Sequence, residues 1–546
     1  MATLSASPAP PRGWQLGISR AEGVALACLG AALLLQFELV FSKSVNWDEF
    51  YHFSEIQQYR LGRWSPSLQT PYVYLFSWVP SLPGDNIAHI QLTRAMLLSF
   101  ELVTLVAIFA MARHFTSREA ALLCSLAYLT GGYVFLHAFA IRADIIAAAL
   151  LSVALWSLLT RPLRALEVAL ACLLVTLAFI ATIKSVLWAP AFLGVLLYRL
   201  DGPQLRSRGV RALAIAAAAG LLGLALLQAM GLLAYVLASA EWMFSAGVFP
   251  QGQYLLQQVT MAPALAVLIA TAVVFSLTAA RGATRLALLS LLAPLLTLAV
   301  YRNSFPYHFV FILPPALVAV APVADQLLRR YGLAPLAAIL LANAALLSLS
   351  EDRSVLPRQE AIQLATRQVF PEPVVYVDES GMIGNFPRAV GRFASGWALA
   401  DYKRKGRPIY SRSLEREPVP LLITNSDSLQ NLFFATGSGD RLLAEDVRTL
   451  RTNYVPHWGT LFVAGKSLAA GTREQPIDVA VPGTYTVEGA PVEIDGRQYR
   501  PGDLVSLDRG PHRVTVLGGE GAVLRWGDHL RRPDVPWPEG PIFTDY

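Results

Sequence analysis

The stretch SVNWDEFYHFSEI, residues 44–56, follows the first long apolar run and carries two adjacent acids, Asp48 and Glu49, among aromatic residues. Asn46 is a favourable N-cap, and Glu49 stands three positions after it, so a helix that begins here with a capping box explains Glu49. Asp48 shares one face of such a helix with His52. We expect Asp48 either to complement the helix dipole or to do chemistry at a lipid surface.

The composition places most of the chain in a bilayer. The 546 residues are 54% hydrophobic and only 15% charged, whereas a soluble domain is nearer a quarter charged. The formal net charge of +6 is small for this length, and the Lys and Arg residues form no dense stripe. A nucleic-acid partner is therefore not expected.

The apolar runs predict a polytopic α-helical membrane protein with about 11 spanning helices. Residues 1–20 are expected to be a disordered cytoplasmic tail, and residues 21–350 the membrane domain. The expected spans are 21–41, 94–112, 119–137, 144–159, 165–182, 185–199, 212–235, 260–280, 286–301, 309–327 and 332–350.

Basic residues predict the orientation, because cytoplasmic loops carry an excess of Lys and Arg. With the N-terminus inside, the inner loops hold most of the arginines and the outer loops hold few. The chain after residue 350 then lies outside. Since most basic residues are Arg, which hints at a GC-rich bacterial genome, we expect the bacterial cytoplasmic (inner) membrane, with a periplasmic or otherwise extracytoplasmic C-terminal region.

That C-terminal region is predicted to be soluble. Apolar runs shrink to strand length in PVVYVD (373–378) and PLLITN (420–425), so residues 351–465 suggest an extracytoplasmic α/β region. Residues 466–546 carry frequent turn signals between alternating apolar residues, which indicates a β-rich module, either a sandwich or a meander. All three cysteines precede residue 173, so no disulfide is expected in this part of the chain.

Polar residues gather at the expected outer ends of the spans. Besides the acid pair, they are His52, Arg94, Arg142, Asp144, Lys184, Glu241, Arg302 and His308. Charged groups at bilayer depth usually pair or line a cavity. Because all of them lie on the expected outer side of the membrane, we expect them to form one site there.

Each of these positions also has an ordinary interpretation. Arg142 and Asp144 begin an expected span, where an arginine can snorkel and an acid can complement the helix dipole; alternatively, Arg142 positions an acid or binds an anionic head group. Arg302 and His308 fit an aromatic belt or a phosphate site at a helix start. Lys184 is either an interfacial anchor or another phosphate contact.

With these motifs the sequence resembles the GT-C glycosyltransferase superfamily, in particular the bacterial relatives of protein O-mannosyltransferases and of lipid A aminoarabinose transferases. The resemblance rests on WDEFYH with Asp48 and Glu49 in the first outer loop, and on Arg142 and Asp144 at the outer start of the fourth span. Interfacial segments near residues 55–64 and 86–93 and a soluble C-terminal domain also fit. It covers about residues 21–350.

The resemblance implies an inverting glycosyltransferase that moves a sugar from a polyprenyl-phosphate donor to an acceptor at the outer face. Asp48 is then the expected general base, and Glu49 orients it or contacts the acceptor. Arg142, Lys184 and Arg302 are the expected cations for the donor phosphate. His52, Asp144, His308 and Arg94 are expected to support the site.

Several alternatives stay open at this point. No cofactor is required by this chemistry, although His52, His308 and Asp48 leave a divalent metal possible. The acceptor is a lipid, a glycan or a protein, and the sugar is open. A transporter or flippase of a lipid-linked sugar is the main alternative, but transporters often show internal repeats and none is seen. A membrane-anchored glycan sensor leaves the acid pair unexplained.

Overall fold

The computed structural model describes residues 18–64, 70–200, 206–231, 233–234, 237, 247–391, 396–433, 441–471, 474–537 and 539–544. Glu241 and nearly all of the expected N-terminal tail lie outside these ranges. The chain forms two compact units. The helical unit comprises residues 1–39, 98–139 and 144–350, and the mixed α/β unit comprises residues 40–97, 140–143 and 351–546.

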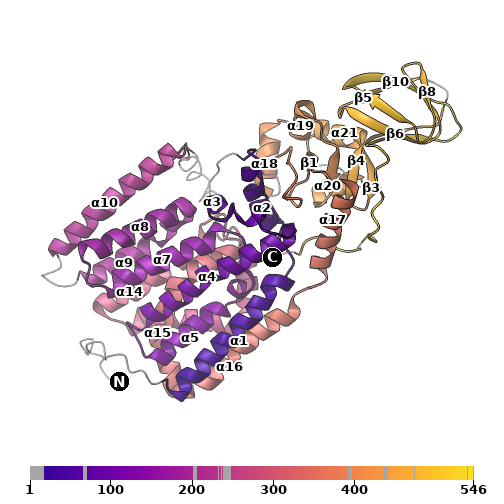
Figure 1. Cartoon of the computed structure of the whole chain (residues 1–546). Helices are drawn as coiled ribbons and strands as arrows, with labels where there is room; N and C mark the ends of the chain where they lie inside the picture. Colours follow the sequence, from indigo (N-terminus) through magenta and orange to yellow (C-terminus); the bar gives the residue numbers. More distant parts are fainter. Residues whose placement is uncertain are drawn as a thin grey trace. The chain divides into compact units, whose positions relative to one another are not determined.

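Long apolar helices build the helical unit (Figure 1). Its elements are α1 (Arg20–Ser42), the greater part of α4 (Asn86–Ala112), α5 (Arg118–Leu129), α6 (Tyr133–His137), α7 (Ala143–Thr160), α8 (Ala165–Ala181), η2 (Ile183–Trp188), α9 (Ala189–Arg199), α10 (Arg206–Ala229), α12 (Gly252–Met261), α13 (Pro263–Thr278), α14 (Gly282–Leu292), η4 (Ala293–Ala299), α15 (Pro306–Tyr331) and α16 (Leu333–Ser350).

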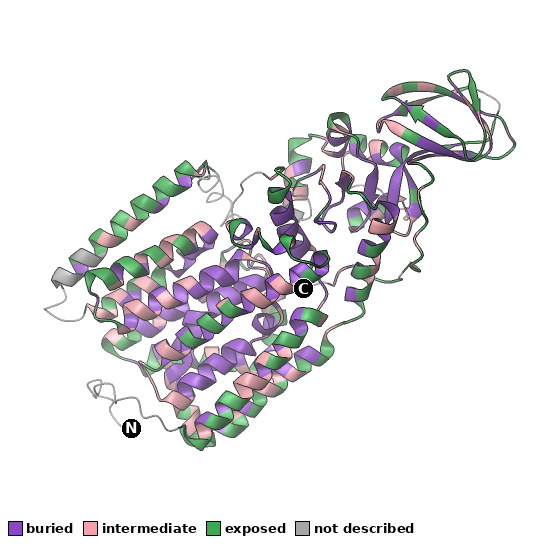
Figure 2. Ribbon diagram, viewed as in Figure 1, coloured by how far each residue is buried: buried purple, intermediate pink, exposed green. Residues whose placement is uncertain are grey.

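Helix α15 lies at the centre of the helical unit. It packs against α5, α6, α13 and α14. In its most apolar stretch of 18 residues, 94% of the residues are buried. It starts at Pro306, where a missing N–H does no harm. By contrast, α10 presents many exposed apolar side chains (Figure 2). Exposed apolar helix faces of this extent suit contact with lipid rather than water.

Fewer helices are long and apolar enough to span a membrane than the sequence suggests. Among the described residues, six helices are long and apolar enough to cross a membrane, or seven if the bent pair α12 and α13 counts as one span. Most other expected spans are helical but short or interrupted. The expected span 119–137, for example, breaks at Gly132, whose φ of +60° favours glycine. The chain is a multi-pass membrane protein.

The mixed unit combines short helices with two sheets. Its helices are α2 (Trp47–Arg60), α3 (Tyr72–Phe76), η1 (Val79–Ser81), the first turns of α4, α17 (Val355–Val369), α18 (Gly396–Lys405), α19 (Tyr410–Arg416), α20 (Asp427–Phe433) and α21 (Ala444–Asn453). Its strands are β1 (Tyr376–Val377), β2 (Leu421–Ile423), β3 (Tyr454–Trp458), β4 (Leu461–Leu468), β5 (Gln475–Val479), β6 (Gly483–Gly489), β7 (Val492–Ile494), β8 (Arg497–Tyr499), β9 (Leu504–Leu507), β10 (Gly510–Val516) and β11 (Ala522–Trp526).

The larger sheet has the order β1-β2-β4-β11-β6-β9, with β3 paired to β4, and the smaller has the order β5-β10-β7-β8. Strands β1 and β2 are parallel, with Tyr376 opposite Leu421. They fall within the two strand-length runs of the sequence. Alternating apolar residues such as Val487, Val505 and Val514 form the β-rich core. The predicted C-terminal β-containing region is therefore confirmed, while the expected division at residue 465 falls inside β4.

Candidate functional site

The acid pair begins α2 as the capping pattern predicts. The Asn46 side chain accepts a hydrogen bond from the Asp48 N–H at 3.0 Å, and the Glu49 carboxylate accepts one from the Asn46 N–H at 3.4 Å. The capping box is therefore present. All residues of α2 from Asp48 to Gln58 are nevertheless buried, so an ordinary surface helix does not account for the acids.

Asp48 is paired with Arg142, the arginine at the expected outer start of the fourth span. The Nη1 group of Arg142 donates a hydrogen bond to Asp48 Oδ2, and both side chains are largely buried. His52 follows one turn later on α2, with its Nε2 3.5 Å from Asp48 Oδ1. The other ring nitrogen, Nδ1, lies 2.6 Å from the hydroxyl of Tyr72. Tyr72 therefore orients the imidazole beside the acid.

Glu49 has a different role from its neighbour. Its Oε1 and Oε2 accept hydrogen bonds from Nε and Nη2 of Arg94, at 2.9 and 2.5 Å. Oε1 also accepts one from the Ile141 N–H at 3.1 Å, one residue before Arg142. This carboxylate therefore holds together the start of α2, the third turn of α4 and the segment that carries Arg142.

The guanidinium of Arg94 is enclosed by acceptors. Besides Glu49, it donates to the carbonyl oxygens of Val40, Lys43 and Ser44, at 3.3, 2.9 and 2.9 Å. Arg94 has no exposed surface. The planar guanidinium of arginine directs five N–H groups at separate acceptors, whereas the ammonium of lysine is a compact point charge that reaches fewer of them. The expectation that Arg94 supports the acid pair thus has a geometric basis.

The far end of α2 is held by the loop that follows β1. Arg388 forms a buried ion pair with Glu55, and Gln58 donates to the Phe386 carbonyl at 3.0 Å while accepting from the Arg388 N–H at 3.2 Å. The pKa of Arg388 is raised, because burial, which lowers it, is outweighed by Glu55 and neighbouring tyrosines. The sequence alone gives no sign of this contact, since more than 300 residues separate its partners.

Glycine makes that loop possible at one point. Asp378 accepts hydrogen bonds from the N–H groups of Gly381 and Met382, both at 2.8 Å, and so folds the loop back. Gly381 has a φ of +74°, and a Cβ there would collide with the Ser54 hydroxyl of α2. The loop can therefore lie against α2 only with glycine at this position.

A second group of predicted residues meets within the helical unit. Lys184 donates to Asp144 Oδ1 at 2.8 Å, and both side chains are buried. The Lys184 ammonium also lies 6.0 Å from the ring centre of Tyr301, whose ring is 4.9 Å from that of His308. His308 Nε2 is 2.8 Å from the Thr297 hydroxyl.

Arg302 adjoins this second group through the chain, because it follows Tyr301. Its carbonyl oxygen accepts a hydrogen bond from Gln251 at 3.3 Å, and its side chain is half-buried. The predicted residues thus form two clusters, one in each unit. The first contains Asp48, Glu49, His52, Arg94 and Arg142. The second contains Asp144, Lys184 and His308, with Arg302 beside Tyr301.

An apolar cavity of about 530 Å³ lies next to the second cluster. It opens among α7, α8, η2, α9 and α10, and Ser185 and Val186 line it directly after Lys184. Leu158, Phe179, Phe192 and Gly220 are among its other lining residues. Sequence patterns alone do not single out the lining residues of this cavity.

The side chains do not fit a metal site. Among the described residues, no three His, Cys, Asp or Glu side chains form a group able to hold a metal ion. His52 and Asp48 are two potential ligands of one unit, while His308 belongs to the other unit and bonds Thr297.

Comparison with known proteins identifies the fold. No protein-family model and no curated protein sequence matches the chain. The solved structure of ArnT from Cupriavidus metallidurans bound to undecaprenyl phosphate is similar, with a TM-score of 0.51 and 13% identity over 75% of this chain and 94% of that chain. ArnT in the apo state gives a TM-score of 0.51 and 14% identity over 76% and 95%. The chain therefore has the fold of these two ArnT structures, as the resemblance in the sequence implied.

Proposed function

We propose, with the ArnT-like fold as the premise, that this protein is a membrane glycosyltransferase that takes a sugar from a polyprenyl-phosphate donor. The observation that carries the proposal is the buried Asp48–Arg142 pair at the start of α2. It supplies an acid and a cation at the motifs on which the resemblance rests. The ArnT structure bound to undecaprenyl phosphate supports a lipid-linked donor.

Asp48 is the proposed general base. The guanidinium of Arg142 favours the ionised form of the carboxylate, which is the form that accepts a proton. An acceptor hydroxyl would give its proton to Asp48 as its oxygen bonds to the anomeric carbon. The bond from that carbon to the phosphate oxygen breaks on the opposite face, and its electron pair leaves with the polyprenyl phosphate. The anomeric centre is therefore inverted.

Arg142 then has two competing partners. Without donor, it is paired with Asp48. A bound phosphate is a second anion for the same guanidinium, and its charge grows as the glycosidic bond breaks. Donor binding would thus draw Arg142 toward the phosphate and release a lone pair of Asp48 for the acceptor. Glu49 is fixed by Arg94 and acts by orienting its neighbour.

Lys184 and Arg302 are the other proposed phosphate contacts. Lys184 is the second residue of η2, and the two residues that follow it line the apolar cavity. The donor has a charged phosphate and an apolar lipid tail. These two parts match the buried Lys184 ammonium and the apolar cavity beside it. We propose that the first isoprene units lie in that cavity and that the phosphate lies toward Lys184.

The proposed setting is the bacterial inner membrane, with the mixed unit outside the cytoplasm. The loop-by-loop bias of arginines supports this orientation. Protease added to intact spheroplasts should then cleave within residues 351–546. Full protection of that region would reverse the orientation.

The function is tested with purified protein in liposomes that contain polyprenyl-phosphate sugars extracted from the native membranes, together with an envelope extract as acceptor. Mass spectrometry should detect free polyprenyl phosphate and a glycosylated acceptor. Arg302→Ala should raise the donor KM several-fold, whereas Arg285→Ala, an exposed arginine on α14, should leave it unchanged. A flippase would move the donor without releasing polyprenyl phosphate, so absence of release from every donor would reject the proposal.

A further inference from the structure

The backbone that leads into the acid pair is held by one buried amide from a distant helix. Gln359 of α17 accepts a hydrogen bond from the Val45 N–H at 2.8 Å and donates one to the Val45 carbonyl at 2.7 Å. The same Nε2 group donates to the Ile542 carbonyl at 2.9 Å. Gln359 has no exposed surface. Both backbone groups of Val45 are thus paired with one side chain, next to the N-cap of α2.

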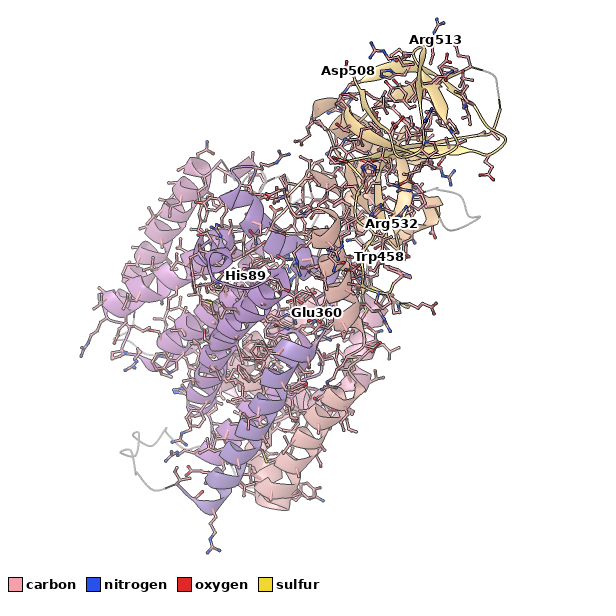
Figure 3. The ribbon with its side chains drawn as sticks, turned by 45° about the vertical axis from the view of Figure 1, so that its right-hand side comes forward. His89, Glu360, Trp458, Asp508, Arg513 and Arg532 are labelled. Carbon is pink, nitrogen blue, oxygen red and sulfur yellow. The ribbon has the colours of Figure 1, made fainter. Side chains whose placement is uncertain are left out.

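Residues 531–537 and 539–544, here called the strap, run from the β-rich module to this amide. At one end, the Arg531 carbonyl lies 2.9 Å from His457 Nε2, and Trp458 Nε1 donates to the Val535 carbonyl at 3.0 Å. Figure 3 shows Trp458 and Arg532 near each other there, and Glu360 on α17. Arg358 of α17 donates to the Pro541 carbonyl at 3.1 Å.

At its other end the strap contacts the residues around the acid pair. Phe543 packs edge-on against Phe50, with ring centres 6.1 Å apart and an interplanar angle of 69°. Thr544 and Ser44 share a hydrogen bond of 3.3 Å between their hydroxyls. The strap therefore reaches both sides of the pair, at Ser44 before it and at Phe50 after it.

We propose that Gln359 is a positioning residue for the reaction, and that Gln359 and the strap together form a clamp that sets the place of Asp48. This inference rests on the proposed function. Val45 stands three residues before Asp48, so rotation of its backbone moves the acid. A primary amide that faces both the N–H and the C=O of one residue opposes that rotation in both directions.

The clamp also has a chemical consequence. General-base catalysis requires the carboxylate to lie within hydrogen-bond distance of the proton that it abstracts. Displacement of about 1 Å can lower a rate by roughly 100-fold. Loss of the clamp should therefore lower kcat, while donor binding through cations of the helical unit should change little. The β-rich module thereby acts on the reaction through the strap.

The test compares Gln359→Leu and Phe543→Ala with Gln363→Leu in the full-length protein. Gln363 lies one turn further along α17 and is also buried, and its Nε2 has no hydrogen-bond partner among the described residues. It is therefore a matched control for a buried amide on this helix. Gln359→Leu should lower kcat at least 10-fold with donor KM changed less than 2-fold, and Phe543→Ala should lower kcat several-fold. Gln363→Leu should retain the parent kcat.

Hydrogen exchange gives a second measurement that does not depend on activity. Backbone amides of residues 45–50 should exchange at least 10-fold faster in Gln359→Leu than in Gln363→Leu. If these amides exchange faster while kcat is unchanged, the clamp is structural only and the inference is overturned. Unchanged exchange also overturns it. If the parent protein transfers no sugar, the proposed function fails, and the exchange result still decides whether the clamp exists. Phe543→Ala serves where Gln359→Leu does not fold.

Discussion

Glu49 and Arg94 form a buried two-point ion pair that joins the start of α2 to α4. The two bonds measure 2.9 and 2.5 Å, and neither side chain reaches solvent to more than a few per cent. Asp48, the preceding residue, pairs instead with Arg142. The adjacent acids thus have separate partners, since Glu49 joins two helices through Arg94 and Asp48 faces the guanidinium of Arg142.

The Glu49–Arg94 pair should be essential for folding. Arg94→Met leaves the Glu49 carboxylate buried without its partner, and breaking such a pair lowers the free energy of unfolding by about 3–5 kcal/mol. Thermal unfolding in detergent measures this loss. Arg404→Met removes an exposed arginine paired with Asp401, and should change stability by no more than about 0.5 kcal/mol. Equal effects of the two substitutions would contradict the structural role of Arg94.

The Lys184–Asp144 pair should separate stability from activity. Lys184→Met isolates the buried carboxylate of Asp144 and should destabilise the protein by about 3 kcal/mol or more. The double variant Lys184→Met/Asp144→Asn removes the uncompensated charge and should recover most of that loss. It should nevertheless stay inactive, because the donor phosphate lacks its ammonium. Melting curves and transfer rates for the parent and the two variants test this, and an active double variant would exclude Lys184 as a phosphate contact.

Glu379 should make the mixed unit less stable as pH rises. Burial raises the pKa of Glu379 to about 7, although Ser426, which donates to the carboxylate, opposes the shift. The folded state therefore binds a proton more tightly than the unfolded state does. The neutral Glu379 carboxyl therefore contributes fully to the free energy of unfolding below about pH 4.5. This contribution is lost as pH rises through 7, by roughly 3 kcal/mol in total.

Glu379→Gln should remove this pH dependence, because the amide is neutral throughout. Melting temperatures of the parent and the variant, measured between pH 5 and pH 8, provide the comparison. The parent should lose stability across that range relative to the variant. Parallel curves would show that the carboxyl titrates at its ordinary pKa.

Local patterns predicted the structure around the acid pair. The cap at Asn46 follows from the residue types at positions 46 and 49, and the face shared by Asp48 and His52 follows from helical periodicity. The apolar runs likewise predicted where helices lie. Span number was harder, because glycine breaks such as Gly132 and short 3-10 turns such as η2 interrupt runs whose hydropathy is continuous.

Contacts distant in sequence were not predictable from one sequence. Glu55 with Arg388, and Val45 with Gln359, join residues more than 300 positions apart. Glutamine on a helix gives no local sign that its amide will pair with a particular backbone residue. The sequence places the residues between the first two expected spans in an outer loop of the membrane domain, whereas in the structure residues 40–97 form one compact unit with residues 140–143 and 351–546.

The most direct test of the account is the turnover of Asp48→Asn in liposomes that contain the polyprenyl-phosphate donor. The control is Asp85→Asn, an exposed acid just before α4 in the same unit. The amide keeps the shape of the carboxylate but cannot take a proton from the acceptor, so kcat should fall by about 100-fold or more. Asp85→Asn should match the parent. Polyprenyl phosphate released by a folded Asp48→Asn protein at the parent rate would contradict the role of Asp48 as base.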